Sequence, residues 1–130
     1  SNEVFKWGIY KRRDVNKLFV KNITFLGDAA HPIVPFLGQG GCMALEDAYI
    51  FGKLLIKNRE DIIHAQREYK RLRAPRLRMV KRMSETQGYL YHLSNPFIIS
   101  IRNFLMRNSS STTDKRLMKI WDYDPNNDLK

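Results

Sequence analysis

The sequence has few of the features that mark several common protein classes. It contains a single cysteine, Cys42, which excludes an internal disulfide framework and a cysteine-rich zinc site. It also lacks an apolar run of about 18 residues, and no basic segment followed by an apolar stretch opens the chain, which argues against a transmembrane span and a signal peptide. We therefore expect a cytoplasmic protein with no transmembrane span.

Groups that bind metals or carry out acid–base catalysis are also sparse. The three histidines, His31, His64 and His92, are too dispersed for a recognisable ligand set, so we expect no metal. Glu46 and Asp47 are adjacent, which favours compensation of a helix dipole and a buried ion pair over an acid–base pair. We assign no catalytic residue, and we interpret His31 as a structural hydrogen-bonding residue rather than a general base.

Positive charge exceeds negative charge along the chain. Of the 130 residues, 23 are Lys or Arg and 13 are Asp or Glu, which gives a net charge of +10. Nine basic and three acidic residues lie between Arg59 and Arg82, so more than half of the excess is found there. Such a segment is able to follow a phosphate backbone. However, these arginines flank an apolar stripe without a nucleic-acid-binding motif, so we expect no specific nucleic-acid partner.

The N-terminal part of the chain predicts strands. Residues 5–10 alternate large apolar and other side chains, and residues 19–26 are rich in β-branched and aromatic side chains. Each segment is expected to be a short strand, and the second runs into a turn at Gly27-Asp28. The prolines and glycines of residues 29–41 then predict a shaped loop without a regular element.

The rest of the chain predicts helices over residues 42–57, 61–83 and 97–107. Pro75 is expected to kink or interrupt the second helix, and residues 84–93 to continue it at an angle. Asn95-Pro96 predicts the N-cap and first residue of the third helix. Residues 108–113 are expected to be a polar linker, followed by a short helical turn.

Composition and pattern together predict a single domain over residues 1–130, mainly α with one or two short strands. The hydrophobic share of 43% supports a globular chain rather than a disordered one. The expected parts are strands and a turn at 5–28, a loop at 29–41, helices at 42–107 and a C-terminal tail at 108–130.

Residues 23–48 combine a strand end, an acidic turn, a proline-braced loop and a glycine cluster that opens a helix. An acid at the end of a strand, here Asp28, is placed to accept hydrogen bonds from sugar hydroxyls. Gly38, Gly40 and Gly41 allow a ligand to approach the backbone closely, and the free N–H groups of a first helical turn attract negative charge. These features indicate a site for an anionic, polyol-bearing cofactor, although such glycines are also typical of an ordinary helix start.

The same segment resembles a known motif. The residues that carry the resemblance are Gly27-Asp28-Ala29-Ala30-His31-Pro32, Pro35, Gly38-Gln39-Gly40, Ala44 and Glu46-Asp47-Ala48. This pattern is similar to the second FAD-binding motif of the class A flavoprotein monooxygenases, the aromatic hydroxylases that include salicylate hydroxylase. A downstream series and the ending are similar too: Tyr69, Arg73, Pro75-Arg76, Ser84 and Trp121-Asp122-Tyr123-Asp124.

The resemblance implies the C-terminal part of an α/β, Rossmann-like FAD-binding fold. It also implies FAD as cofactor, NAD(P)H and O₂ as co-substrates, and hydroxylation of an aromatic or similar ring. Residues 32–36 are implied to help wall the substrate pocket, Asp28 to contact the ribityl or pyrophosphate region, and residues 38–43 to lie against the isoalloxazine. The implied cofactor-binding residues are Asp28, Pro35, Gly38, Gln39, Gly40, Gly41, Cys42 and Met43.

The GxGxxG unit, with which the family holds the ADP half of FAD, does not occur in the sequence. We therefore expect the chain to correspond to the C-terminal third of such an enzyme and to be inactive alone. Its expected partners are the missing N-terminal half or a complementing chain. A homodimer is a further expectation, because the strand at 19–26 loses neighbours. The alternative is a non-catalytic remnant or interaction module that self-associates.

Overall fold

The computed structural model describes residues 5, 8, 10, 17–108 and 110–129, and it is mainly helical. Its elements are the strands β1 (Phe19–Val20) and β2 (Ile23–Thr24), the helices α1 (Gly40–Lys57), α2 (Ile62–Tyr91), α3 (Pro96–Asn108) and α4 (Ser110–Trp121), and the 3₁₀ turns η1 (Gly27–Ala29), η2 (Pro35–Leu37) and η3 (Pro125–Leu129). The predicted fold class is confirmed. The strand expected at residues 5–10 lies largely outside the described residues. Within the described ranges, no helix is long and apolar enough to cross a membrane.

The two strands form a small antiparallel hairpin rather than the single strand expected over residues 19–26. Phe19 pairs with Thr24, and Val20 pairs with Ile23. The chain reverses at Lys21, whose φ of 51° lies in the left-handed region that two-residue hairpin turns require. Propensity alone does not reveal this turn, because Lys is not a typical left-handed residue.

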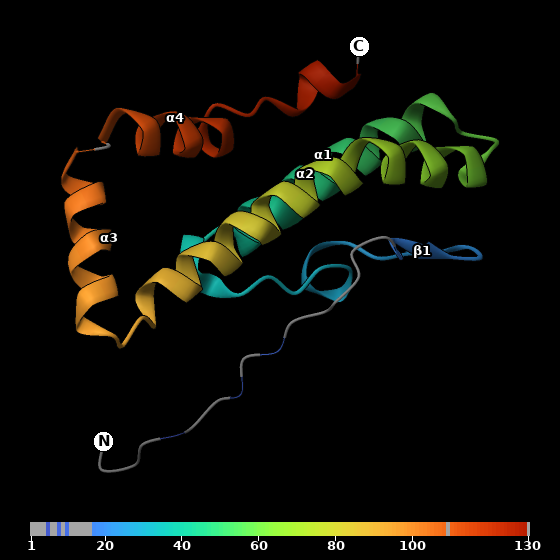
Figure 1. The fold of residues 1–130 in the computed structure, drawn as a ribbon. Coiled ribbons are helices and arrows are strands. Elements are labelled where there is room, and N and C mark those ends of the chain that lie inside the picture. The colour runs from blue at the N-terminus through green and yellow to red at the C-terminus, as the bar shows by residue number, and fades with distance from the viewer. Residues whose placement is uncertain (1–4, 6–7, 9, 11–16, 109, 130) are drawn as a thin grey trace.

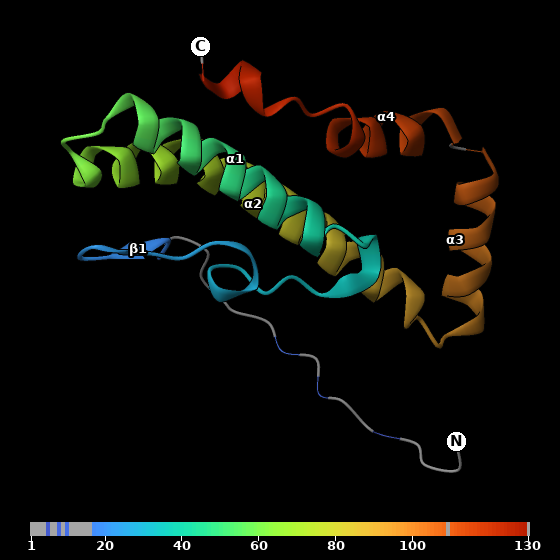
Figure 2. The same cartoon turned by 180° about the vertical axis from the view of Figure 1, so that it is seen from behind.

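Helices α1 and α2 run side by side and enclose the core between them, as both views show (Figures 1 and 2). The β1–β2 hairpin and the loop that follows it lie along one flank of this pair (Figure 1). The buried cluster draws apolar residues from these elements: Leu18, Ala30, Met43, Ile50, Leu54, Ala65, Tyr69, Leu77 and Val80. The spacing of 43, 50 and 54 on α1 gives the single apolar stripe of an amphipathic helix.

Pro75 was expected to kink or interrupt the second helix. The interruption is wrong, because α2 continues through Pro75 and residues 84–91 belong to the same helix. Asp61 caps its N-terminus by accepting a hydrogen bond from the His64 N–H (2.8 Å). Residues on both sides of the proline, Tyr69 and Leu77, are buried in the core. This tertiary packing outweighs the local penalty of about 3 kcal/mol for proline inside a helix.

Helices α3 and α4 extend beyond the α1–α2 pair. α3 turns away from the end of α2, and α4 returns toward the pair (Figures 1 and 2). The predicted cap of α3 is confirmed, since Asn95 Oδ1 accepts a hydrogen bond from the Phe97 N–H (3.0 Å). The linker expected at residues 108–113 is wrong from Ser110 onward, where α4 begins. Serine is favoured at helix starts as well as in linkers, so a serine run does not distinguish the two.

We predict that Gly88→Ala destabilises the protein although alanine favours helices. A Cβ atom on Gly88 would lie 2.3 Å from Cε2 of Phe36, whose ring is flanked by Tyr91 and His92. Overpacking of this kind costs about 1–3 kcal/mol of unfolding free energy, measured by urea denaturation. The matched control is Gly52→Ala in α1, where the new Cβ meets no atom within 4 Å and we expect a gain of about 0.5–1 kcal/mol. Equal stabilisation by both substitutions would contradict the packing of Phe36 on α2.

Candidate functional site

The predicted cofactor-binding residues lie along one short stretch between η1 and the first turn of α1. Asp28 is in η1 and exposed, and Pro35 opens η2. Gly38 ends η2 with a φ of 64°, a left-handed conformation that favours glycine. A Cβ atom on Gly40 would lie 3.9 Å from Oδ1 of Asp28, so the carboxylate lies beside the helix start. The fold thus brings the acidic turn and the glycine cluster together.

The N-terminus of α1 is open. The helix begins at Gly40, two residues earlier than the expected start, so Gly40 and Gly41 form its first turn. The first N–H groups of a helix have no intrahelical carbonyl, and the Gln39 side chain does not cap them. Cβ atoms on Gly38 or Gly41 would meet nothing within 4 Å. The result is an uncovered patch of backbone at the positive end of a helix, which suits an electron-rich or anionic group.

The next two residues face different environments. The Cys42 side chain is exposed, next to the open backbone. The Met43 side chain is buried, and its N–H donates to the Gln39 carbonyl (2.9 Å) in the first hydrogen bond of the helix. The Met43 carbonyl accepts a hydrogen bond from Arg73 (3.4 Å). Of the predicted residues, Met43 therefore belongs to the core beneath the site.

A buried carboxylate supports the loop from below. Asp47 is fully buried and accepts three hydrogen bonds: from the Gly27 N–H (3.0 Å), from Nε2 of His31 (2.5 Å) and from Nε of Arg73 (2.7 Å). Burial by itself would raise the pKa of Asp47, but the His31 hydrogen bond and the Arg73 charge outweigh it, so the pKa lies below its ordinary value of 3.8. The two ends of η1 and helix α2 are thereby fixed to one residue of α1.

Glu46 extends this network toward the C-terminal segment. Its carboxylate accepts hydrogen bonds from Arg73 (2.8 Å) and from two nitrogens of Arg76 (2.9 and 3.2 Å). The guanidinium of Arg76 also lies 4.0 Å from the centre of the Tyr123 ring, a cation–π contact. Burial and a hydrogen bond to Asp128 raise the pKa of Tyr123 to about 12. The residues after α4 are therefore tied to α2 through charged groups.

Two further side chains of α2 hold the loop by its backbone. The Tyr69 hydroxyl donates to the Phe25 carbonyl before η1 (3.3 Å). The Ser84 hydroxyl donates to the Val34 carbonyl just before η2 (2.5 Å). The loop is thus anchored on each side of its exposed part.

The expected buried ion pair is confirmed, with Glu46 and Asp47 both paired to Arg73. The expected compensation of the helix dipole is wrong, because α1 begins at Gly40 and has no acidic residue in its first turn. His31 is buried and hydrogen-bonded to Asp47, in keeping with its interpretation as a hydrogen-bonding residue. Sequence reasoning did not identify Arg73 and Arg76 as the partners. Both belong to the basic segment that also suggested nucleic-acid binding, yet both side chains are buried. The signal that separates them from their neighbours is their place in the motif-like series that includes Tyr69 and Ser84.

Metal ligands do not converge in this region. Among the residues that the structure describes, no three His, Cys, Asp or Glu side chains form a group suited to a metal ion. The polar groups of the site instead present one exposed carboxylate, Asp28, and the free backbone N–H groups of α1. This set can accept hydrogen bonds from hydroxyls and stabilise negative charge.

We predict that Arg73→Ala destabilises the protein by about 3–5 kcal/mol, because it leaves the buried carboxylate of Asp47 without its ionic partner. Urea denaturation followed by circular dichroism measures the change. Arg71→Ala is the matched control: its side chain is 64% exposed, it pairs only at the surface with Glu68, and it should change stability by no more than about 1 kcal/mol. Similar losses for both variants would contradict the buried network.

We also predict that the protein loses stability in acid through Asp47. A carboxyl group whose pKa is lower in the folded than in the unfolded state stabilises the fold at pH values above its unfolded pKa, here 3.8. This contribution disappears as the pH falls through the lower pKa of the folded state. The free energy of unfolding should therefore fall with pH below about 4, as measured by urea titrations between about pH 2 and pH 6. Asp47→Asn should flatten this part of the profile, and an unchanged slope would contradict the assignment.

Comparison with curated proteins identifies relatives of the chain. It is 39% identical over 93 residues to the 3-amino-4-hydroxybenzoate 2-monooxygenase PtmB3 of Streptomyces platensis, a match that covers 72% of this chain and 24% of the relative. It is 34% identical over 107 residues to the 3-hydroxybenzoate 6-hydroxylase of Klebsiella oxytoca, which covers 82% and 27%. The aurachin C monooxygenase/isomerase of Stigmatella aurantiaca is 31% identical over 126 residues, 96% of this chain and 33% of that protein.

The chain thus spans between a quarter and a third of the length of these relatives. No family model matches it. No solved structure is significantly similar to it. The relatives are aromatic hydroxylases and monooxygenases, as the motif between Gly27 and Ala48 predicts. The chain belongs to this family of aromatic hydroxylases and monooxygenases and corresponds to a C-terminal segment of its members.

Proposed function

We propose that this chain forms the flavin-binding part of a monooxygenase that hydroxylates an aromatic or similar ring with NAD(P)H and O₂. The observation that carries the proposal is the position of the exposed Asp28 carboxylate beside the open N-terminus of α1 at Gly40. The names of the relatives, which include hydroxybenzoate hydroxylases, support the reaction class.

The residues present fit FAD. Asp28 accepts hydrogen bonds from the hydroxyls of the cofactor, and its exposure leaves it free to do so. The space above Gly38 and Gly41, in which an added Cβ meets no atom within 4 Å, admits a flat ring against the backbone. The helix N-terminus stabilises negative charge there by about 0.3–1 kcal/mol, and by up to about 2 kcal/mol when partly buried. When bound, FAD supplies the redox chemistry and oxygen activation that the side chains lack.

The chain's own residues orient and enclose the reaction rather than carry it out. The loop at 32–36 helps to wall the substrate pocket, and the Ser84–Val34 hydrogen bond fixes its position. His31 is buried with Nε2 engaged by Asp47, so it positions the loop and transfers no proton to substrate. Preorganised backbone donors of this kind act without reorganising during the reaction.

The ADP half of the cofactor is held outside these residues, because the sequence contains no GxGxxG unit. The partner is the missing N-terminal half or a complementing chain, and the 130 residues alone bind FAD weakly and do not turn over substrate. A homodimer is also proposed, since the hairpin leaves Ile23 exposed at a sheet edge. A cytoplasmic, reducing setting agrees with the single cysteine.

A second candidate is a non-catalytic interaction module that self-associates. The specific observation that favours it is the apolar surface of α3, where Phe97 and Phe104 are 74% and 66% exposed. The two candidates differ in flavin binding once the GxGxxG-bearing part is present, because only the first requires it.

We predict opposite outcomes for site and control variants when the chain is joined to, or mixed with, the GxGxxG-bearing part. Asp28→Ala should weaken FAD binding about 10- to 150-fold by removing a charge-assisted hydrogen-bond acceptor. Gly40→Val should abolish flavin binding, because the branched side chain would occupy the space proposed for the flavin ring. It should cause little loss of secondary structure, because the nearest protein atom to a Cβ there is 3.9 Å away. Flavin fluorescence quenching measures both. Arg78→Ala is the control and should leave FAD affinity unchanged; equal weakening by Asp28→Ala and Arg78→Ala would overturn the flavin site.

A further inference from the structure

A groove of about 860 Å³ lies between the C-terminal half of α2, α3 and α4. Figure 1 shows these three helices as three sides of an open frame. Most of the lining is apolar, with contributions from all three helices: Met79, Met83, Leu90, Ile101, Leu105 and Leu117. The monooxygenase assignment leaves this apolar surface unexplained.

The charged residues of the groove are all of one sign. Arg82, Arg102 and Lys119 line it, and no Asp or Glu is among its described lining residues. Arg102 is held in place by donating to the Leu90 carbonyl (2.7 Å), so its charge is fixed beside the apolar floor. Arg82 and Lys119 are exposed. An occupant that complements the groove therefore has an apolar stripe and carries negative charge.

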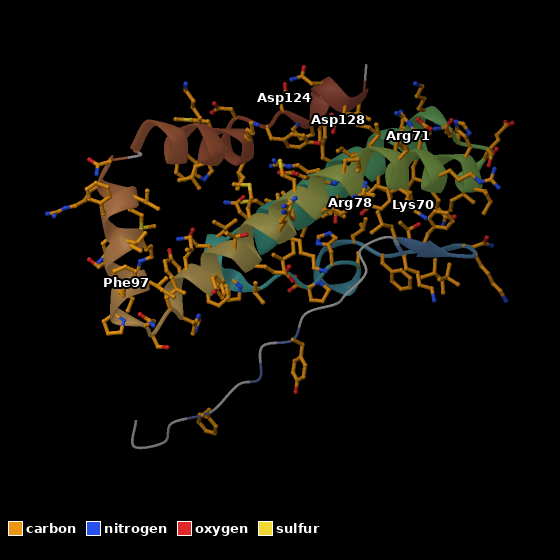
Figure 3. The ribbon with its side chains drawn as sticks, in the orientation of Figure 1. Lys70, Arg71, Arg78, Phe97, Asp124 and Asp128 are labelled. Carbon is orange, nitrogen blue, oxygen red and sulfur yellow. The ribbon has the colours of Figure 1, made fainter. Side chains whose placement is uncertain are left out.

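The apolar surface continues past the groove itself. Tyr89 lines the groove and is 70% exposed, whereas Phe104 lies on α3 outside the lining and is 66% exposed. Phe97 lies at the first turn of α3, at the far end of the frame (Figure 3). A small ligand inside the groove would leave the exposed ring of Tyr89 largely uncovered, whereas a polypeptide segment lying along the groove covers it. The wall of α2 between Met79 and Leu90 is about 17 Å long at 1.5 Å per residue, which matches a helix of about 11 residues.

We propose that this groove docks an acidic amphipathic helix of another polypeptide, which buries an apolar stripe against α2, α3 and α4 and places carboxylates beside Arg82, Arg102 and Lys119. This is the helix-in-groove mode of recognition, with anchors at helical spacing. A second copy of this chain is a poor occupant, because an isologous contact would bring two basic rims of a chain with net charge +10 together. The groove reaches η2 at Leu37, between Pro35 and Gly38 of the predicted cofactor loop, so docking covers the end of η2 next to the flavin site.

The test uses the full chain and three fluorescein-labelled peptides of about 16 residues, read by fluorescence anisotropy. The first peptide has a Leu stripe and Glu on its polar face, the second replaces every Glu by Lys, and the third is a scramble of the first. We expect the Glu peptide to bind at least about tenfold more tightly than either of the others. Equal binding of the scramble, or tighter binding of the Lys peptide, overturns the proposal.

Substitutions locate the binding. Ile101→Glu, at a position 45% exposed on the groove wall, should weaken the Glu peptide at least about tenfold by charge repulsion and loss of apolar contact. Ile56→Glu is the matched control, since Ile56 is 63% exposed on α1 outside the groove, and it should leave affinity unchanged. Equal weakening by both variants overturns the proposal.

Reversing the charge of basic residues at the groove gives a second readout. Unlike Ile101→Glu, it does not place a carboxylate in an apolar surface. Arg82→Glu combined with Lys119→Glu should transfer preference from the Glu peptide to the Lys peptide. Both side chains are exposed, and the Lys119 group that binds Arg76 is its backbone carbonyl, which the substitution keeps. Failure to switch preference overturns the proposal.

Two other occupants are tested in the same material. Dimerisation seen by light scattering without peptide, and abolished by Ile101→Glu but not by Ile56→Glu, would assign the groove to a second copy and overturn the proposal. Binding to phosphatidylglycerol vesicles that displaces the Glu peptide and shows the same dependence on Ile101 would assign it to a membrane surface, with the same consequence. Absence of both, together with selective binding of the Glu peptide, supports the acidic helix.

Discussion

The buried carboxylate of Asp47 is the constraint on which the rest of the structure depends. Removing a carboxylate from water costs several kcal/mol, so the fold must supply donors for it. It does so from three places: the turn at Gly27, the imidazole of His31 and the guanidinium of Arg73. These donors lie on η1, on the loop after it and on α2, so satisfying one charge on α1 fixes the relative positions of all three segments. An apolar residue in its place would fill the space but would not select this arrangement.

The hydrogen bonds that hold the cofactor loop determine which of its residues stay exposed. The chain is held at Phe25 by Tyr69, around η1 by Asp47, and at Val34 by Ser84. Asp28, between these anchors, and Gly38, Gly41 and Cys42, beyond the last of them, are exposed. The backbone donors of α1 are therefore presented on a rigid base, which is the requirement for recognition by backbone rather than by mobile side chains.

Local sequence signals predicted the elements whose cause is local. The Asn95 cap, the stripe of α1 and the glycine-rich helix start are examples, because each depends on neighbouring residues. The turn at Lys21 was not predictable in this way because Lys is not a typical left-handed residue. The continuous helix through Pro75 was not predictable because tertiary packing outweighs the local propensity there. In the site, too, the local features were predictable and the long-range contacts were not. Asp28 and the glycines follow from the motif, whereas the pairing of Asp47 with Arg73 joins residues 26 positions apart and depends on how α1 packs against α2.

The basic residues of helix α2 have different roles, although together they suggest a nucleic-acid-binding segment. A count of basic residues over α2 suggests a polyanion-binding face, but position along the helix assigns those residues to different tasks. Arg73 and Arg76 point inward and neutralise Glu46 and Asp47, so they contribute nothing to an external field. Arg82 lies one to two turns further on, at the edge of the apolar groove, where its charge meets solvent. Because α2 is one uninterrupted element, the helix that holds the cofactor loop through Tyr69, Arg73 and Ser84 also forms, in its second half, the wall of the groove. A partner bound in the groove therefore contacts the same helix, α2, that positions the cofactor loop.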